Sequence, residues 1–241
     1  MKNKFAAVAI AFLAWTGIAS AQTPVTNNFL FNANLGVPDG DPNGLALATT
    51  LSGLSGSILD VTLTLNLTGG NNSDLYAFLT GPNGGFAILL NRVGLGYANP
   101  YGYEDTGFSV TLSDAATYNV HNYQNAAGFT LNGNGQLTGA WLPDGRNLDP
   151  QSAPSLFDST PVTETLSSFS GTNPNGIWTF YIADLSGGGQ STLQSWELNI
   201  TTVPEPSTLA LAAAGALGLL LFRRFRHRKL SRSAIGIPGL K

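Results

Sequence analysis

The end of the chain carries the feature that most restricts what it folds into. Val203-Pro204-Glu205-Pro206 is followed by an unbroken apolar run, Leu209 to Phe222, and then by a basic cluster. The basic residues of this cluster are Arg223, Arg224, Arg226, Arg228 and Lys229. A buried helix of a soluble core would show polar residues on one face, and this run has none. We therefore predict that the tail is a sorting label and that the folded domain lies before it.

The apolar run is short for a membrane span. Leu209–Phe222 has 14 residues, whereas a bilayer is crossed comfortably by about 20. Snorkelling arginines and the preceding Thr208 extend it to a thin transmembrane helix over 208–222. The positive-inside preference places the basic stop, 223–229, and the extension 230–241 in the cytoplasm, and residues 22–203 outside it.

The start of the chain indicates export as well. Lys2 and Lys4 precede an apolar stretch, Phe5 to Ile18, which ends in the small residues Ala19-Ser20-Ala21. This pattern predicts a signal peptide over 1–21, cleaved before Gln22 by signal peptidase after passage through the secretory translocon. The alternative is an uncleaved anchor helix.

The tail resembles the PEP-CTERM sorting signal of exosortase substrates. The matching features are Pro204-Glu205-Pro206, the Ala/Leu/Gly helix and the arginine-rich stop, in that order over residues 203–229. The resemblance implies a Gram-negative bacterium with an exopolysaccharide-rich envelope. It also implies an inner-membrane-anchored precursor, an exosortase-like membrane protease as partner, and a mature protein at the cell surface or in the extracellular matrix. The extension after the basic cluster departs from the usual pattern.

Charge is distributed very unevenly along the chain. Residues 22–203 contain 13 of the 14 acidic side chains but only Arg92 and Arg146 among the 11 basic ones, a formal net charge of −11. Such a surface repels nucleic acid, so we expect no nucleic-acid partner. It suits cation binding or plain solubility. The chain has no cysteine, which excludes disulfides, thiolate nucleophiles and zinc–thiolate sites.

Alternating apolar and polar residues predict strands in this domain. Such segments lie at 61–67, 75–80, 86–90, 108–112, 178–182 and 196–200, separated by Gly/Asn/Pro turns. Residues 113–165 are less regular, and we expect long loops there with one or two short strands. Amphipathic helices between strands are lacking. The pattern predicts an all-β fold, an antiparallel jelly-roll-like β-sandwich, with Trp178 and Trp196 in one core.

The same segments resemble the P (P/Homo B) domain of proprotein convertases over most of residues 45–201. The residues that carry the resemblance are Val61–Leu65, Asp74-Leu75, Gly81–Gly84, Ser168–Asp184, Gly187–Gly189 and Leu193–Leu198. This resemblance implies a β-sandwich jelly roll over 22–202. In that family the domain follows a subtilisin-like protease. Because the signal peptide is predicted to end only about two dozen residues before the first matching segment, we expect no protease domain before it and do not transfer peptidase activity.

Candidate catalytic residues are few. His121 is the one histidine between 22 and 203, and a lone loop histidine is typically exposed or hydrogen-bonded. The adjacent Glu104 and Asp105 would point to opposite faces of a strand, whereas a glycosidase needs two facing carboxylates. We therefore expect a protein that is not an enzyme.

Two kinds of ligand fit the remaining residues. Asp74 and Asp184 lie in Gly/Asn-rich turns that suit a structural calcium ion, although such residues also stabilise turns without metal. Tyr97, Tyr101 and Tyr103 form the densest group of loop tyrosines and could stack on the sugars of an exopolysaccharide, or simply cover the end of the sandwich.

We thus expect a structural or adhesive protein of the exopolysaccharide matrix (biofilm). The alternative is an accessory domain of a secreted protease or a carbohydrate-active protein.

Overall fold

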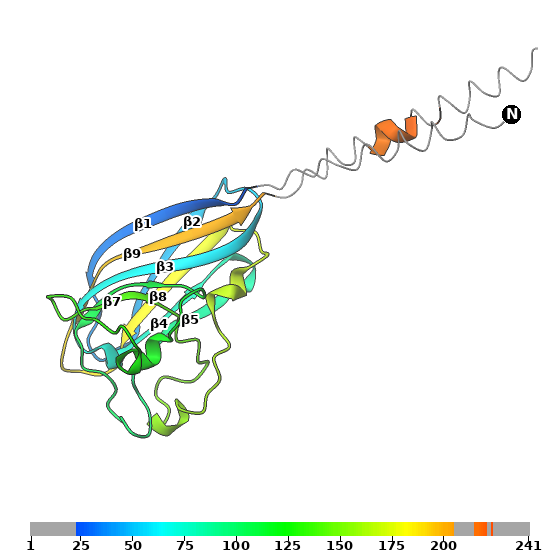
Figure 1. Ribbon diagram of the computed structural model, residues 1–241. Helices are drawn as coiled ribbons and strands as arrows, with labels where there is room; N and C mark the ends of the chain where they lie inside the picture. Colours follow the sequence, from blue (N-terminus) through cyan, green and yellow to red (C-terminus); the bar gives the residue numbers. More distant parts are fainter. Residues whose placement is uncertain (1–22, 205–214, 221–222, 224–241) are drawn as a thin grey trace, which may run out of the picture. The chain divides into compact units, whose positions relative to one another are not determined.

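Alternating side chains build two β-sheets in this computed structural model, which describes residues 23–204, 215–220 and 223. The first sheet has the strand order β1-β9-β3-β6-β7, and the second has the order β2-β8-β4-β5 (Figure 1). The strands are β1 (Val25–Gly36), β2 (Asp41–Leu51), β3 (Ser57–Gly69), β4 (Leu75–Thr80), β5 (Phe86–Asn91), β6 (Gly107–Leu112), β7 (Leu137–Trp141), β8 (Gly176–Asp184) and β9 (Ser191–Val203). The short 3-10 helices are η1 (Asn72–Asp74), η2 (Pro82–Gly84), η3 (Val120–Asn125), η4 (Pro154–Leu156) and η5 (Leu166–Phe169).

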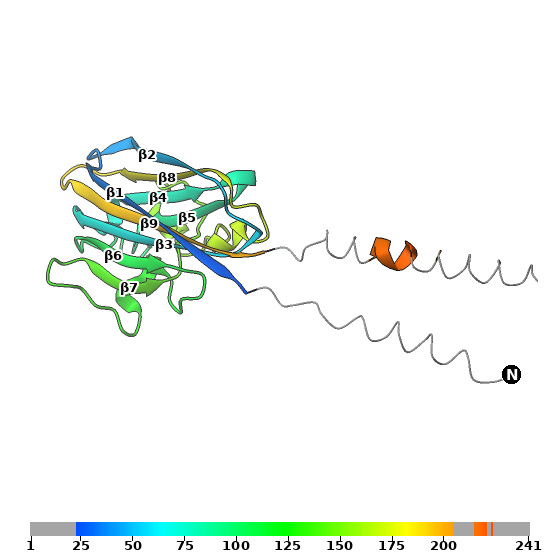
Figure 2. The same cartoon turned by 90° about the horizontal axis from the view of Figure 1, so that it is seen from above.

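The predicted all-β sandwich is confirmed. The strand pairs are antiparallel except β6 with β7, which run parallel. Figure 2 shows the labelled strands of the two sheets within residues 23–204, seen from above. Most of the irregular chain falls between β5 and β8, where η3, η4 and η5 interrupt long loops. The expectation for residues 113–165 is confirmed by β7, a single short strand.

The core lies between the two sheets. Along β3, the side chains of Leu63, Leu65 and Leu67 are buried, and the threonine and asparagine residues between them are half-buried. Trp178 and Trp196 both belong to this core, as predicted. The Trp196 ring stacks on Phe31 of β1 at 4.3 Å and on Phe180 of β8 at 5.2 Å. One indole therefore joins the two sheets, and burial of such rings contributes several kcal/mol on a scale of about 25 cal/mol per Å².

The sequence patterns miss the first two strands. In β1 the core-facing positions are Phe29, Phe31 and Ala33, which are only half-buried, and asparagines fill most of the alternate positions. Asparagine is depleted in strands and common in turns. Both strands lie at the edge of a sheet, where burial is partial and the alternation is weaker.

The predicted membrane helix lies mostly outside the described residues. Of 208–222, the structure describes 215–220, which are helical. Among the described residues, no helix has the length and hydropathy needed to cross a bilayer.

Candidate functional site

The sorting segment begins where the last strand ends. Val203 closes β9, lies opposite Ser57 of β3, and is followed by the half-buried Pro204. Gly56 packs against the Val203 carbonyl so closely that a Cβ would clash with it, and its φ of +85° lies in the region that favours glycine. The start of the predicted processing motif is therefore fixed to the folded domain without a linker.

Most other predicted processing residues lie outside the described part of the chain. They are Ala19, Ala21, Gln22, Glu205, Pro206, Arg224, Arg226, Arg228 and Lys229. Arg223 is described, is helical and is exposed.

The strand register brings Asp74 and Asp184 to one end of the second sheet. Leu75 of β4 lies opposite Asp184 of β8, and the backbone N–H of Leu185 donates to the Asp74 carbonyl at 2.8 Å. Asp184 is fully buried. Its Oδ1 accepts a long hydrogen bond of 3.4 Å from the backbone N–H of Ser186, and its Oδ2 has no hydrogen-bond partner among the described residues.

Burial changes the chemistry of this carboxyl group. The pKa of Asp184 is raised to about 6, mainly by desolvation; the negative charges of Asp74 and Asp39 contribute to the rise, whereas the Ser186 N–H and Arg92 act in the opposite direction. The Asp184 carboxylate at neutral pH is therefore costly unless a proton or a cation reaches Oδ2.

Arg92 brings a positive charge to this end of the sheet. Its guanidinium lies 3.6 Å from Asp74 Oδ1, and it donates to the Ser73 carbonyl at 2.8 Å and to Ser186 Oγ at 3.1 Å. Its φ of +48° is unusual for a side chain with a Cβ. These contacts hold the arginine beside Asp74, where its charge partly offsets the acidic residues.

The donor set near Asp184 bears on the predicted calcium ion. Within the described ranges, no group of three or more carboxylate, histidine or cysteine side chains could hold a metal. A calcium ion would need six to eight oxygens, so backbone carbonyls and water would have to supplement Asp74 and Asp184. At this end of the sheet, Oδ2 of Asp184 is buried without a hydrogen-bond partner among the described residues, and a bound cation would offset the cost of its negative charge.

The tyrosine loop between β5 and β6 separates the three predicted glycan contacts. Tyr97 and Tyr101 are 82% and 80% exposed. In the same loop, Gly96 and Asn99 exchange two backbone hydrogen bonds of 3.1 and 3.2 Å, and the N–H of Tyr97 donates to Asp158 Oδ2 at 2.8 Å. Two exposed rings are thus carried on a loop with a defined backbone.

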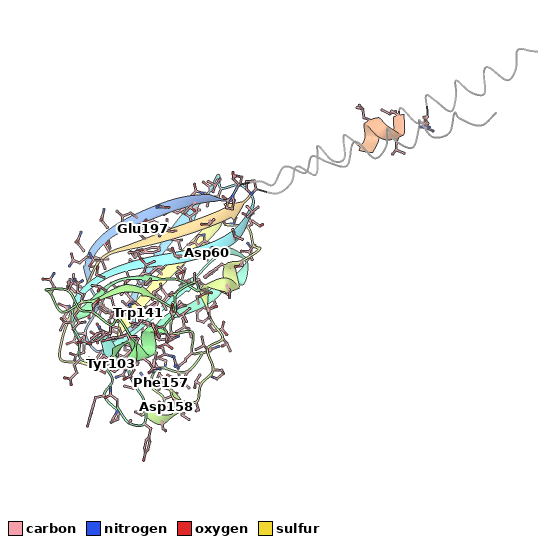
Figure 3. The ribbon with its side chains drawn as sticks, in the orientation of Figure 1. Asp60, Tyr103, Trp141, Phe157, Asp158 and Glu197 are labelled. Atoms are coloured by element: carbon pink, nitrogen blue, oxygen red, sulfur yellow. The ribbon has the colours of Figure 1, made fainter. Side chains whose placement is uncertain are left out.

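The expectation that Tyr103 shares this surface is wrong. Its side chain is only 7% exposed, and its ring packs edge-on against Tyr123 at 4.6 Å. The next turn of the loop carries it inward, since its backbone N–H donates to the Val93 carbonyl at 3.2 Å. Figure 3 places Tyr103, Phe157 and Asp158 at the loop end of the sandwich.

The sequence did not predict a buried polar network around His121. The ring donates or accepts at both nitrogens: Nδ1 lies 2.7 Å from Asp144 Oδ2, and Nε2 lies 2.9 Å from the Leu95 carbonyl oxygen. Arg146 donates to Asp144 Oδ1 at 3.1 Å. The imidazole also stacks on Phe157. His121 is therefore a hydrogen-bonding residue that joins three loops, and the partners of its ring nitrogens lie more than 20 positions away in sequence.

A second unpredicted feature is an aromatic row on the outer side of the second sheet. Phe78 of β4 stacks on Tyr181 of β8 at 4.6 Å, with Tyr76 and Phe86 packed at their sides. Alternation along β4 and β8 predicts that these residues face outward, but not that the rings meet. Because Phe78 and Tyr181 cover each other's faces, they are poorly placed to stack on a sugar ring.

Comparisons with known proteins identify one segment. Residues 202–226 match the PEP-CTERM protein-sorting motif. The chain carries a PEP-CTERM sorting signal. It begins at the end of β9, where Val203 and Pro204 were predicted to open it, and it implies an exported, membrane-anchored precursor that an exosortase processes. A comparison with curated proteins finds no match to the chain.

Two solved structures show a weak likeness to this chain. The crystal structure of the complex between the Aeromonas sobria serine protease and the chaperone is 15% identical, with a TM-score of 0.41, over 81% of this chain and 29% of that one. The crystal structure of the serine protease of Aeromonas sobria is 14% identical, with a TM-score of 0.42, over 80% and 29%. The chain spans about 29% of the length of these structures, and a likeness this weak supports no argument about activity.

Proposed function

We propose that the β-sandwich is the cargo of the sorting signal: a non-enzymatic, structural or adhesive protein of an exopolysaccharide layer. The observation that supports this is the direct join between β9 and the PEP-CTERM motif, because cleavage within 203–206 would release the whole sandwich with its sheets complete. The mature protein would then begin at Gln22 after removal of the signal peptide.

Intact mass measurement in cells with and without the exosortase gene tests this processing. We expect a precursor that retains its tail in the deletion strain, and a form ending within 203–206 in the parent strain. A protein of the same intact mass in both strains would contradict the proposal.

Contact with polysaccharide would use Tyr97 and Tyr101. Their rings are exposed, three positions separate the residues on one loop, and hydrogen bonds fix the backbone between them. Aromatic faces with this exposure suit stacking against sugar rings. The domain favours neutral sugars over acidic ones, because its net charge of −11 repels anions.

Affinity electrophoresis in gels that contain neutral polysaccharide tests this contact. We expect retardation of the wild-type protein and at least a threefold weaker effect for the Tyr97→Ala, Tyr101→Ala double variant. Tyr118→Ala is the matched control, because Tyr118 is 43% exposed but lies outside this loop. Equal retardation of the wild type and the double variant would argue against the tyrosine loop.

A structural calcium ion would be held by Asp74 and Asp184. The unpaired, buried Oδ2 of Asp184 supports this proposal, because a cation would offset the cost of its charge. We expect calcium to raise the melting temperature at pH 8 and EDTA to reverse the rise. The same melting temperature in calcium and in EDTA would rule out the site.

The second candidate function is that of an accessory domain for a separately encoded secreted protease or carbohydrate-active protein. The resemblance of segments such as Ile177–Asp184 to the P/Homo B domain supports it. Co-purification of a protease or glycosidase activity with the exported protein, lost on high-salt washing, would favour this candidate over the matrix protein.

A further inference from the structure

The first strand presents an open edge of the first sheet. Within the described residues, β1 pairs with β9 on one side and has no strand on the other. Its 12 residues, Val25–Gly36, include neither a charged residue nor a proline. Edge strands in natural proteins are usually short, or carry lysines, prolines or bulges that prevent pairing with another chain. The single bulge in β1, between Asn32 and Leu35, leaves Val25–Asn32 in regular register.

The side chains of this edge leave apolar surface uncovered. On the outer face Leu30 is 59% exposed and lies between asparagines at positions 28 and 32. On the core-facing side, Phe29 and Phe31 are only half-buried although they pack against the core. A strand added beside β1 would cover all three.

Charge is compatible with a second copy of this chain as the source of that added strand. A domain with a net charge of −11 repels a second copy of itself over most of its surface, but β1 itself is uncharged. The nearest acidic side chain on the outer face is Glu197 of β9, opposite Leu30 in the sheet; Figure 3 labels it on β9. If two copies paired through β1, their Glu197 residues would be three strand spacings apart, about 14 Å. That exceeds the screening length of about 8 Å at physiological salt.

The edge formed by β2 in the second sheet fits a partner less well. In β2, Asp41 and Pro42 begin the strand, and a bulge between Asp41 and Leu45 interrupts its pairing with β8. Its exposed side chains at 46 and 48 are alanines, which offer little apolar surface.

We propose that two copies of this chain associate through antiparallel pairing of their β1 strands, with Leu30 on the twofold axis. A twofold axis perpendicular to the sheet keeps each side chain on the same face in both copies. Residues opposite each other in an antiparallel pair also share a face, and successive residues alternate between faces. The axis must therefore pass through a residue that lies opposite its own copy. Placing Leu30 there buries the exposed leucine against its counterpart and sets Phe29 opposite Phe31 of the second copy. Cross-strand pairs of this kind stabilise antiparallel sheets.

The absence of cysteine from the chain allows a direct test. Single cysteines are introduced on the outer face into the full chain in detergent, and the variants are then oxidised with copper phenanthroline. The positions are Thr26, Asn28, Leu30 and Asn32. Residues opposite each other in an antiparallel pair have Cα atoms about 4.5–5.5 Å apart, a separation that a disulfide accepts. If Leu30 lies opposite its own copy, Asn28 lies opposite Asn32 of the second copy. Each of these residues is then four residues along the strand from its own copy, which is too far for a disulfide between identical positions.

We expect dimer yield on non-reducing gels to peak at Leu30→Cys, at least fivefold above the control Leu59→Cys. Leu59 of β3 is 51% exposed but lies away from β1. A maximum at another position would overturn the Leu30 register. Yields that are uniform, or no higher than the control, would overturn the pairing, and so would a maximum at Ala46→Cys on β2.

A second variant covers the case in which oxidation traps random collisions. Leu30→Lys places like charges opposite each other, and we expect it to weaken self-association at least tenfold in sedimentation equilibrium of the full chain. Leu59→Lys, with the same change of charge, should associate as the wild type does. Equal association constants for the two variants would overturn the proposal.

Discussion

Replacing Asp184 by asparagine tests whether burial of the ionised carboxyl group lowers the stability of the fold. The folded-state pKa of about 6 exceeds the ordinary value of 3.8, so folding favours the protonated form. The associated stability is fully present below about pH 4 and is lost as the pH rises through 6. A difference of this size corresponds to at most about 3 kcal/mol, and screening reduces it to about 1–2 kcal/mol.

Asparagine keeps the oxygen that accepts from Ser186 and removes the charge at Oδ2. We therefore expect Asp184→Asn to be about 1–2 kcal/mol more stable than wild type at pH 8 in EDTA, and equal to it near pH 4. Urea unfolding of residues 22–203, followed by tryptophan fluorescence across this pH range, gives the difference directly.

The matched control is Asp60→Asn, which removes the same charge at an exposed position. Its stability difference from wild type should vary little with pH. Parallel stability curves for wild type and Asp184→Asn would refute the reasoning about burial. In calcium the order should reverse, because wild type gains the stabilisation of the bound ion and Asp184→Asn does not; a wild type that does not respond to calcium ends only the metal proposal.

Other substitutions test the packing around the proposed sites by urea unfolding. Asp144→Asn breaks a fully buried carboxylate network and should cost about 3–5 kcal/mol; a loss below 1 kcal/mol would show that His121 and Arg146 do not depend on it. Gly56→Ala should cost at least about 2 kcal/mol, because its φ is positive and the new Cβ meets the carbonyl that ends β9; a neutral result would contradict the tight junction. Trp178→Phe loses the 2.9 Å bond from Nε1 to the Pro174 carbonyl together with ring volume, and should cost about 1–3 kcal/mol, whereas an unchanged midpoint would contradict its core position.

The interior strands were predictable because burial there is complete and periodic. Leu63, Leu65 and Leu67 of β3 are buried and alternate with half-buried polar residues, and Trp178 of β8 is buried in the same way; a period of two is the pattern of a strand with one face in the core. The edge strands β1 and β2 were not predictable on the same basis, since only part of each face is buried and asparagine fills several of the exposed positions of β1.

The candidate sites divide in the same way. The sorting signal is local in sequence, so its order of features suffices to find it. The contacts of Asp184 depend on which strands are neighbours, and those of His121 on loops that meet only in the folded domain. Tyr103 shows the limit most clearly: it lies two residues from Tyr101, yet one turn of backbone exposes one ring and buries the other.

The central claim is that the sandwich is a cargo released from a tail that begins at the end of β9. The most direct test is the C-terminal residue of the protein recovered from the envelope and from the medium, read by mass spectrometry. We predict a mature chain that starts at Gln22 and ends within 203–206. A mature protein that retains the basic cluster at 223–229 would contradict the account.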